Sequence, residues 1–176
     1  MFLTKVGKDN DITQTHISFE LMADDYLLVS VDNSVNDLRG FFSYWRILMK
    51  GGNPPLEVGI NNETGLIKNV TFFVDPNCFE NFRFTVGDTS VGNILVDTSM
   101  FTKPYDFVDI IGGYSVSQVD NSFICKFSKD QSVKESIVNG RIEFFINDEN
   151  QLVGFAINNL TESELKIITG LSKQAL

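Results

Sequence analysis

Few residues of this chain have the types and spacing that catalysis needs. His16 is the only histidine, and imidazole is the usual base of a Ser-His-Asp or Cys-His site near neutral pH. It stands in a polar stretch, where a solvated surface histidine is the simpler interpretation. Asp106 and Asp109 offer two carboxylates for acid–base hydrolysis, but that chemistry needs a defined separation that a sequence does not supply. We therefore predict a protein that is not an enzyme.

Metal and cofactor sites are also not expected. Zinc needs three or four Cys, His or acidic ligands, and the chain offers Cys78, Cys125 and His16, far apart in sequence. Its Asp/Asn-rich turns lack the spacing of a twelve-residue calcium loop, and such residues are common in tight turns. Gly112-Gly113 lacks the lysine and the helix start of a phosphate-binding loop. We expect no cofactor, and two free, half-buried thiols in a reducing compartment.

Charge is the strongest functional signal of the composition. Fourteen Lys and Arg against 23 Asp and Glu give a net charge of −9, which repels nucleic acids and anionic membranes and attracts basic proteins. Seven acids and no Lys or Arg lie between Lys8 and Arg39. The alternative to a docking surface is a solvated face that keeps the protein soluble. The predicted partner-binding residues are Asp24, Asp25, Asp32 and Asp37.

The cellular compartment is predicted from what the sequence lacks. Met1–Lys8 is too short and too charged for a signal peptide. No apolar run approaches the roughly 20 residues of a membrane-spanning helix. We expect a cytoplasmic protein with no membrane contact.

A β-hairpin is the clearest structural element. Leu56, Val58 and Ile60 alternate with Glu, Gly and Asn, which is the period of a strand with one buried face. Turn residues fill 61–65, and 66–74 has the composition of a return strand. We expect Val58 and Ile60 to face the core.

The hairpin has a counterpart 86 positions later. Arg141–Val153 repeats the apolar alternation and the Ile-Asn-(Asn/Asp)-Glu turn, and Val31–Ser34 recurs identically at Val119–Ser122. These repeats predict one domain over 1–176 with two related halves, about 1–88 and 89–176. Chance matching of common turn residues is the alternative. By analogy with Val58 and Ile60, Phe144 and Ile146 should be buried.

Other elements follow from local patterns. Strands are predicted at 17–21, 26–31, 41–49, 122–127 and 133–138, with a helical turn near 34–39, a loop over 8–16 and a type I′ turn at Asn139-Gly140. The segment 87–121 gives no clear pattern. Thr161 and Glu164 form a capping box that begins a C-terminal helix, and Gly170 is its expected C-cap.

Together these elements predict an α+β fold dominated by antiparallel sheet, with roughly nine to eleven strands and a short C-terminal helix. The hairpin 56–72 and the strands around Phe144–Phe155 before that helix resemble small bacterial immunity proteins. The resemblance implies a non-enzymatic protein that neutralises a basic toxin domain, such as a nuclease, by covering it. The alternative is a small-ligand-binding or hydrolytic domain whose pocket is lined by some of the sixteen phenylalanines.

Overall fold

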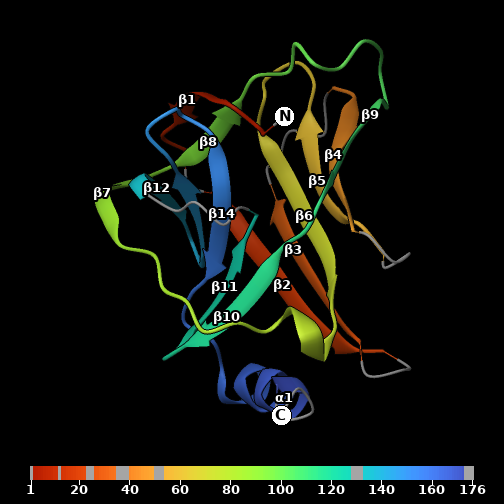
Figure 1. Cartoon of the computed structure of the whole chain (residues 1–176). Coiled ribbons are helices and arrows are strands. Elements are labelled where there is room, and N and C mark those ends of the chain that lie inside the picture. The colour runs from red at the N-terminus through yellow and green to blue at the C-terminus, as the bar shows by residue number, and fades with distance from the viewer. Residues whose placement is uncertain are drawn as a thin grey trace.

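Two six-stranded sheets packed face to face form most of the molecule (Figure 1). The computed structural model describes residues 2–11, 13–22, 26–34, 40–49, 54–127 and 133–172. In spatial order, the first sheet contains β2 (Gln14–Leu21), β3 (Leu27–Ser34), β6 (Ile67–Val74), β5 (Leu56–Asn61), β4 (Phe42–Met49) and β9 (Phe107–Gly112). The second sheet contains β10 (Ser115–Val119), β11 (Ser122–Lys126), β14 (Leu152–Ile157), β13 (Ile142–Ile146), β12 (Val133–Asn139) and β7 (Val86–Val91).

The two sheets have the same strand order. Five consecutive strands, β2–β6 or β10–β14, pair antiparallel in the same sequence of neighbours. A sixth strand then joins in parallel, β9 beside β4 and β7 beside β12. Both sixth strands come from the connection between the five-strand units. An internal duplication would give this arrangement, and the duplication itself stays a prediction.

The identical tetrapeptides do not support that duplication. Val31–Ser34 ends β3, whereas Val119–Ser122 spans the turn from β10 to β11. The hairpin repeat, in contrast, occupies equivalent places, since β5–β6 and β13–β14 are the same pair of strands in the two sheets. Each pair has an irregularity of register at one point, beside Ile60 and beside Ile146.

The core lies between the sheets and is built from directly paired rows of residues. Val58, Ile60, Phe144 and Ile146 are all buried, as predicted. One row crosses the first sheet through Ile17, Val31, Val70, Val58, Trp45 and Val108. The equivalent row crosses the second sheet through Val116, Cys125, Phe155, Phe144, Ile137 and Ser90. Aromatic rings join the two sheets, among them Phe72 and Phe155 with centroids 5.5 Å apart.

A third, two-stranded sheet contains β1 (Lys5–Asp9) and β8 (Asn93–Val96). The loop expected over 8–16 is therefore wrong in part, because β1 extends to Asp9 and β2 begins at Gln14. The chain has 14 strands within its described residues, more than the nine to eleven expected. The additional strands are short and pair with distant segments, so local patterns do not reveal them.

The hairpin at Asn139-Gly140 is present, but its turn is not type I′. Asn139 pairs with Ile142, so Gly140 and Arg141 are the two central residues of the turn. Gly140 has a φ of 58°, but Arg141 is not among the described residues with positive φ, although a type I′ turn needs positive φ at both central positions. Asn139 ends β12 and is fully buried. Its side-chain amide donates to Asn93 Oδ1 at 2.6 Å, and its oxygen accepts from the Thr13 amide at 3.1 Å. These bonds hold the end of β12 to Thr13 and Asn93.

The C-terminal helix begins where the sequence predicts. The Glu164 amide donates to Thr161 Oγ1 at 3.3 Å, and the Thr161 amide donates to Glu164 Oε2 at 2.7 Å, which is a capping box. The helix α1 (Glu162–Ser172) continues through Gly170, so the predicted C-cap is wrong. In Figure 1, α1 covers the end of the sandwich near β10 and β11.

The fold is therefore mostly β, with two mixed but mostly antiparallel six-stranded sheets and one short C-terminal helix. The predicted strands at 17–21, 26–31, 41–49, 122–127 and 133–138 are confirmed within one to three residues. The helical turn expected near 34–39 lies outside the described residues except for Ser34, which ends β3.

Candidate functional site

The outward faces of the two sheets differ, and this difference locates the candidate site. The second sheet's outward face is apolar, with Phe145 and Val153 buried in a second, smaller core. The segment 79–85 contributes Phe82 and Phe84 to this core, and the Phe84 and Phe145 ring centroids are 4.4 Å apart. The protein's own chain thus covers much of this face.

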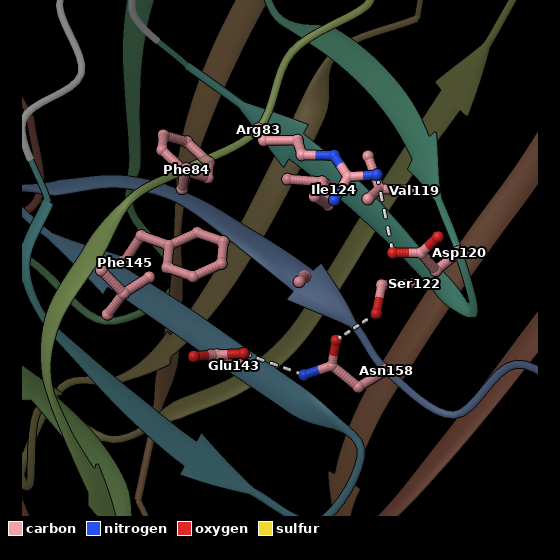
Figure 2. A pocket seen from close by; sticks show the side chains of 11 residues that line it. Arg83, Phe84, Val119, Asp120, Ser122, Ile124, Glu143, Phe145 and Asn158 are labelled. Atoms are coloured by element: carbon pink, nitrogen blue, oxygen red, sulfur yellow. Dashed lines mark hydrogen bonds and ion pairs between the residues drawn. The ribbon is translucent and has the colours of Figure 1, made fainter.

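A hollow of about 260 Å³ remains on the second sheet beside Phe84. Figure 2 shows polar side chains at its rim that are bonded to one another. Ser122 Oγ lies 2.7 Å from Asn158 Oδ1, and Asn158 Nδ2 donates to Glu143 Oε2 at 2.9 Å. An Arg83–Asp120 ion pair at 3.6 Å lies beside Ser122.

Among the described residues, Ser122 in this hollow has no bond to a general base. The serine bonds to an amide oxygen, and an amide cannot take the proton from a nucleophile as imidazole does. The volume is also below the roughly 300–1,000 Å³ of typical small-molecule sites. This geometry therefore gives little support to the alternative function, a small-ligand-binding or hydrolytic domain with a phenylalanine-lined pocket.

The first sheet has an outward face of a different kind, which we call the open face. Directly paired residues of neighbouring strands share a face. One outward row contains His16, Asp32, Asn69, Gly59, Tyr44 and Phe107. The next outward row contains Ser18, Ser30, Thr71, Glu57, Arg46 and Asp109. Except for Gly59, these residues are exposed or half-buried, so the open face is accessible polar and aromatic surface.

Arg46 organises the β9 side of the open face. Its Nε donates to Asp109 Oδ1 at 2.7 Å and its Nη2 to Asp109 Oδ2 at 2.9 Å, a bidentate pair. Glu57 Oε1 lies 3.7 Å from Nη1. The hydrogen bonds to Asp109 raise the pKa of Arg46 despite partial burial. One guanidinium between two carboxylates leaves a local charge of −1.

Aromatic rings surround this ion cluster. The Arg46 guanidinium carbon lies 4.4 Å from the centroid of the Phe107 ring, which stacks on Tyr44 at 5.6 Å. At the end of the same edge, Phe41 and Tyr105 meet edge to face with centroids 5.4 Å apart. Phe41, Tyr105 and Phe107 are 46%, 61% and 52% exposed. Exposed rings beside an arginine are typical of the residues that dominate binding at protein interfaces.

The loop before β9 is held in place by Asp106. Its carboxylate accepts from the Thr102 amide at 2.9 Å, the Thr102 hydroxyl at 3.0 Å and the Phe107 amide at 3.0 Å. The bonds from Thr102, with a smaller contribution from Phe107, hold the pKa of Asp106 below its ordinary value. Asp106 and Asp109 therefore have separate structural partners, Thr102 with Phe107 for Asp106 and Arg46 for Asp109.

One of the four predicted partner-binding residues lies within the described part of the chain. Asp32 is exposed on β3, in the same outward row as Tyr44 and Phe107. The other three, Asp24, Asp25 and Asp37, lie outside the described residues. The sequence interpretation missed the aromatic residues of the open face. The alternation of Phe42, Tyr44 and Arg46 with buried Trp45 indicates one strand of this face. The neighbouring strand β9 lies in the segment 87–121, which has no clear sequence pattern.

The remaining candidate residues are His16 and the two cysteines. His16 is exposed. Cys78 and Cys125 are free thiols, and both are buried rather than half-buried as expected. No group of three potential metal ligands occurs among the described residues, and no helix in the described part of the chain is long and apolar enough to cross a membrane. Comparison with known proteins finds no matching family model and no matching curated protein.

Proposed function

We propose that this chain is a non-enzymatic, cytoplasmic protein-binding protein that uses its open face to cover a basic partner. Its specific form would be that of an immunity protein neutralising a basic toxin domain. One observation carries the proposal: exposed Phe107 and half-buried Tyr44 and Arg46 form an accessible cluster on one sheet, whereas the chain itself covers much of the same face of the other sheet.

Charge favours a basic partner. The whole chain has a net charge of −9, and the described acids of the open face include Asp32, Glu57 and Asp109, against the single cation Arg46 in the two outward rows. Complementary charge raises the association rate and disfavours acidic competitors. A basic nuclease toxin, whose groove must hold phosphates, is a partner of this kind.

The test begins with the tagged chain as bait in its native cell, followed by purification of the protein that it retains. Calorimetric titration then compares wild type with Phe107→Ala and Tyr44→Ala. Loss of a central ring typically costs about 2 kcal/mol or more, roughly a thirtyfold weaker Kd. The matched control is Val91→Ala, because Val91 is 55% exposed on β7, the equivalent strand of the second sheet.

Two outcomes separate the parts of the proposal. An unchanged Kd for both ring variants contradicts binding through the open face. If those variants do weaken binding, growth of cells that express the partner with and without this chain tests neutralisation. Equal growth arrest in both cultures leaves a binding protein but contradicts an immunity role.

A further inference from the structure

The β9 edge of the first sheet has backbone groups aimed away from the molecule. β9 is the last strand of its sheet and pairs with β4 on one side. The Tyr44 amide donates to the Asp106 carbonyl at 2.9 Å, and Tyr44 pairs with Phe107 in parallel register. Because the bonding direction alternates along a strand, residues 106, 108, 110 and 112 bond towards β4. Phe107, Asp109 and Ile111 present their N–H and C=O groups outward.

Most of these outward groups have no partner among the described residues. The Phe107 amide is already bonded to the Asp106 carboxylate at 3.0 Å. Among the described residues, nothing accepts from the amides of Asp109 and Ile111. Within the described part of the chain, two N–H donors and the carbonyls of Phe107, Asp109 and Ile111 are therefore without hydrogen-bond partners.

The β10 edge of the second sheet is covered, and the β7 edge differs from β9 in sequence. β10 is bridged by the protein's own chain, through a parallel bridge between Phe79 and Val116 and a bond from the Glu80 amide to the Val116 carbonyl at 2.8 Å. β7, the spatial equivalent of β9, has the polar sequence Val-Gly-Asp-Thr-Ser-Val. Edge strands are commonly protected by lysine, proline, a bulge or a covering segment. β9, Phe-Val-Asp-Ile-Ile-Gly, has no lysine or proline, and its one charge, Asp109, is paired with Arg46.

From this edge we infer that the partner binds by strand addition: an extended, basic segment of the partner pairs with β9 and extends the first sheet. The inference rests on the proposed function and names its binding mode. Main-chain bonds would supply affinity, and alternate side chains of the added strand would meet Phe107 and Ile111, which is 78% exposed. The net charge of −9 opposes pairing of two copies of this chain and favours a basic segment.

The test uses a defined probe, an acetylated and amidated eight-residue peptide of alternating lysine and valine. Amide hydrogen exchange is followed by NMR in the full chain with and without the peptide. We expect exchange at Asp109 and Ile111 to slow at least tenfold. The outward amides of β7, Thr89 and Val91, are the internal control and should not change. A fully N-methylated peptide keeps the charges but has no amide donors, and it should give no protection.

A pair of variants separates backbone from side-chain effects. Ile111→Pro and Ile111→Ala both remove the exposed side chain, but only proline removes the outward N–H, and edge strands tolerate proline there. Ile111→Pro should abolish the protection at Asp109, and Ile111→Ala should retain it. Fluorescence of Trp45, the only tryptophan, verifies that both variants are folded.

Several results would overturn strand addition. They are absence of slowing at Asp109 and Ile111, equal slowing at Thr89 and Val91, and equal behaviour of the two Ile111 variants. If the amides of Asp109 and Ile111 in the free chain exchange more slowly as the protein concentration rises, β9 pairs instead with a second copy of this chain. With the purified partner, weakening by Phe107→Ala but identical Kd values for the two Ile111 variants leaves the proposed function standing and rejects only this binding mode.

Discussion

Asn61 and Asn147 are the residues that form the two equivalent turns. Asn61 Oδ1 accepts from the amides of Glu63 at 2.9 Å and Thr64 at 3.1 Å. Asn147 Oδ1 accepts from the amides of Glu149 at 3.0 Å and Gln151 at 2.8 Å. The sequence predicted both turns because asparagine commonly bonds to the backbone two residues ahead. The same bonds occupy the oxygen atoms that a calcium site would need.

Phe144 gives the strongest prediction for a single side chain. It is 1% exposed and lies between Phe155 and Ile137 in the inward row of the second sheet. Phe144→Ala should lower the free energy of unfolding by about 3–5 kcal/mol, because a buried ring is lost and a cavity remains. Urea denaturation followed by Trp45 fluorescence measures the change.

The control for Phe144 is Glu149→Ala, since Glu149 is exposed in the turn between β13 and β14. Substitutions at such sites usually stay within about 0.5 kcal/mol. Similar losses for both variants would contradict the assigned core.

Among the elements, α1 depends on its first turn. The capping box of Thr161 and Glu164 is reinforced by Arg141, whose Nη2 lies 2.6 Å from Glu164 Oε2. Burial raises the pKa of Glu164, but the bonds from Arg141 and Thr161 outweigh it and leave the pKa below its ordinary value. The carboxylate therefore stays ionised at neutral pH and links the helix to the β12–β13 turn.

Removal of the cap tests this arrangement. Thr161→Ala should reduce the free energy of unfolding by about 0.5–2 kcal/mol, because the Glu164 amide loses its acceptor. Lys166→Ala, on an exposed position of the same helix, is the control and should have a much smaller effect. Thermal unfolding by circular dichroism compares them. No loss in Thr161→Ala would show that the cap does not stabilise the fold.

Element prediction succeeded where the signal is local. The strands around Trp45 and Phe144 and the start of α1 follow from alternation and capping over a few residues. β1, β7, β8 and β9 do not, because each pairs with a segment remote in sequence and only part of its surface is buried. The aromatic part of the open face depends on β9, so the candidate site could not be assembled from local patterns.

At the scale of the whole molecule, a buried phenol and two buried thiols should lower the free energy of unfolding at alkaline pH. The Tyr114 hydroxyl donates to the Phe73 carbonyl, and Cys78 and Cys125 are nearby. Burial is the main cause that raises the pKa of Tyr114 and Cys125 well above their ordinary values and that of Cys78 to about 11. In the unfolded chain a thiol ionises near pH 9.0.

The sign of the effect follows from proton binding. Above pH 9.0 the unfolded chain binds fewer protons than the folded chain, so the free energy of unfolding should fall as the pH rises from there towards the folded-state pKa values. Urea titrations at pH 8, 9 and 10 measure it, and the combined variant Cys78→Ala and Tyr114→Phe should show a shallower fall. A free energy of unfolding that is constant from pH 8 to 10 would contradict the assigned burial.

Net charge gives a second prediction at this scale. Reversal of two predicted acids, Asp25→Lys with Asp32→Lys, should leave folding intact, slow association with the purified partner and flatten its salt dependence. Stopped-flow association at low and high ionic strength measures both. The control reverses Glu149, in the β13–β14 turn. Unchanged association rates for the double variant would show that these acids belong to a solvated surface and do not contribute to binding.

The parallel pairing of β4 with β9 has a consequence for synthesis. Strands β2 to β6 have left the ribosome once Val74 emerges, but β9 ends at Gly112. At about 5–20 residues per second, the edge of β4 then waits roughly 2–8 s for its neighbour. During that interval the nascent chain exposes Tyr44 and Arg46 on a strand with one unpaired side, a surface that a chaperone or a nascent copy of the same chain can reach before the partner does.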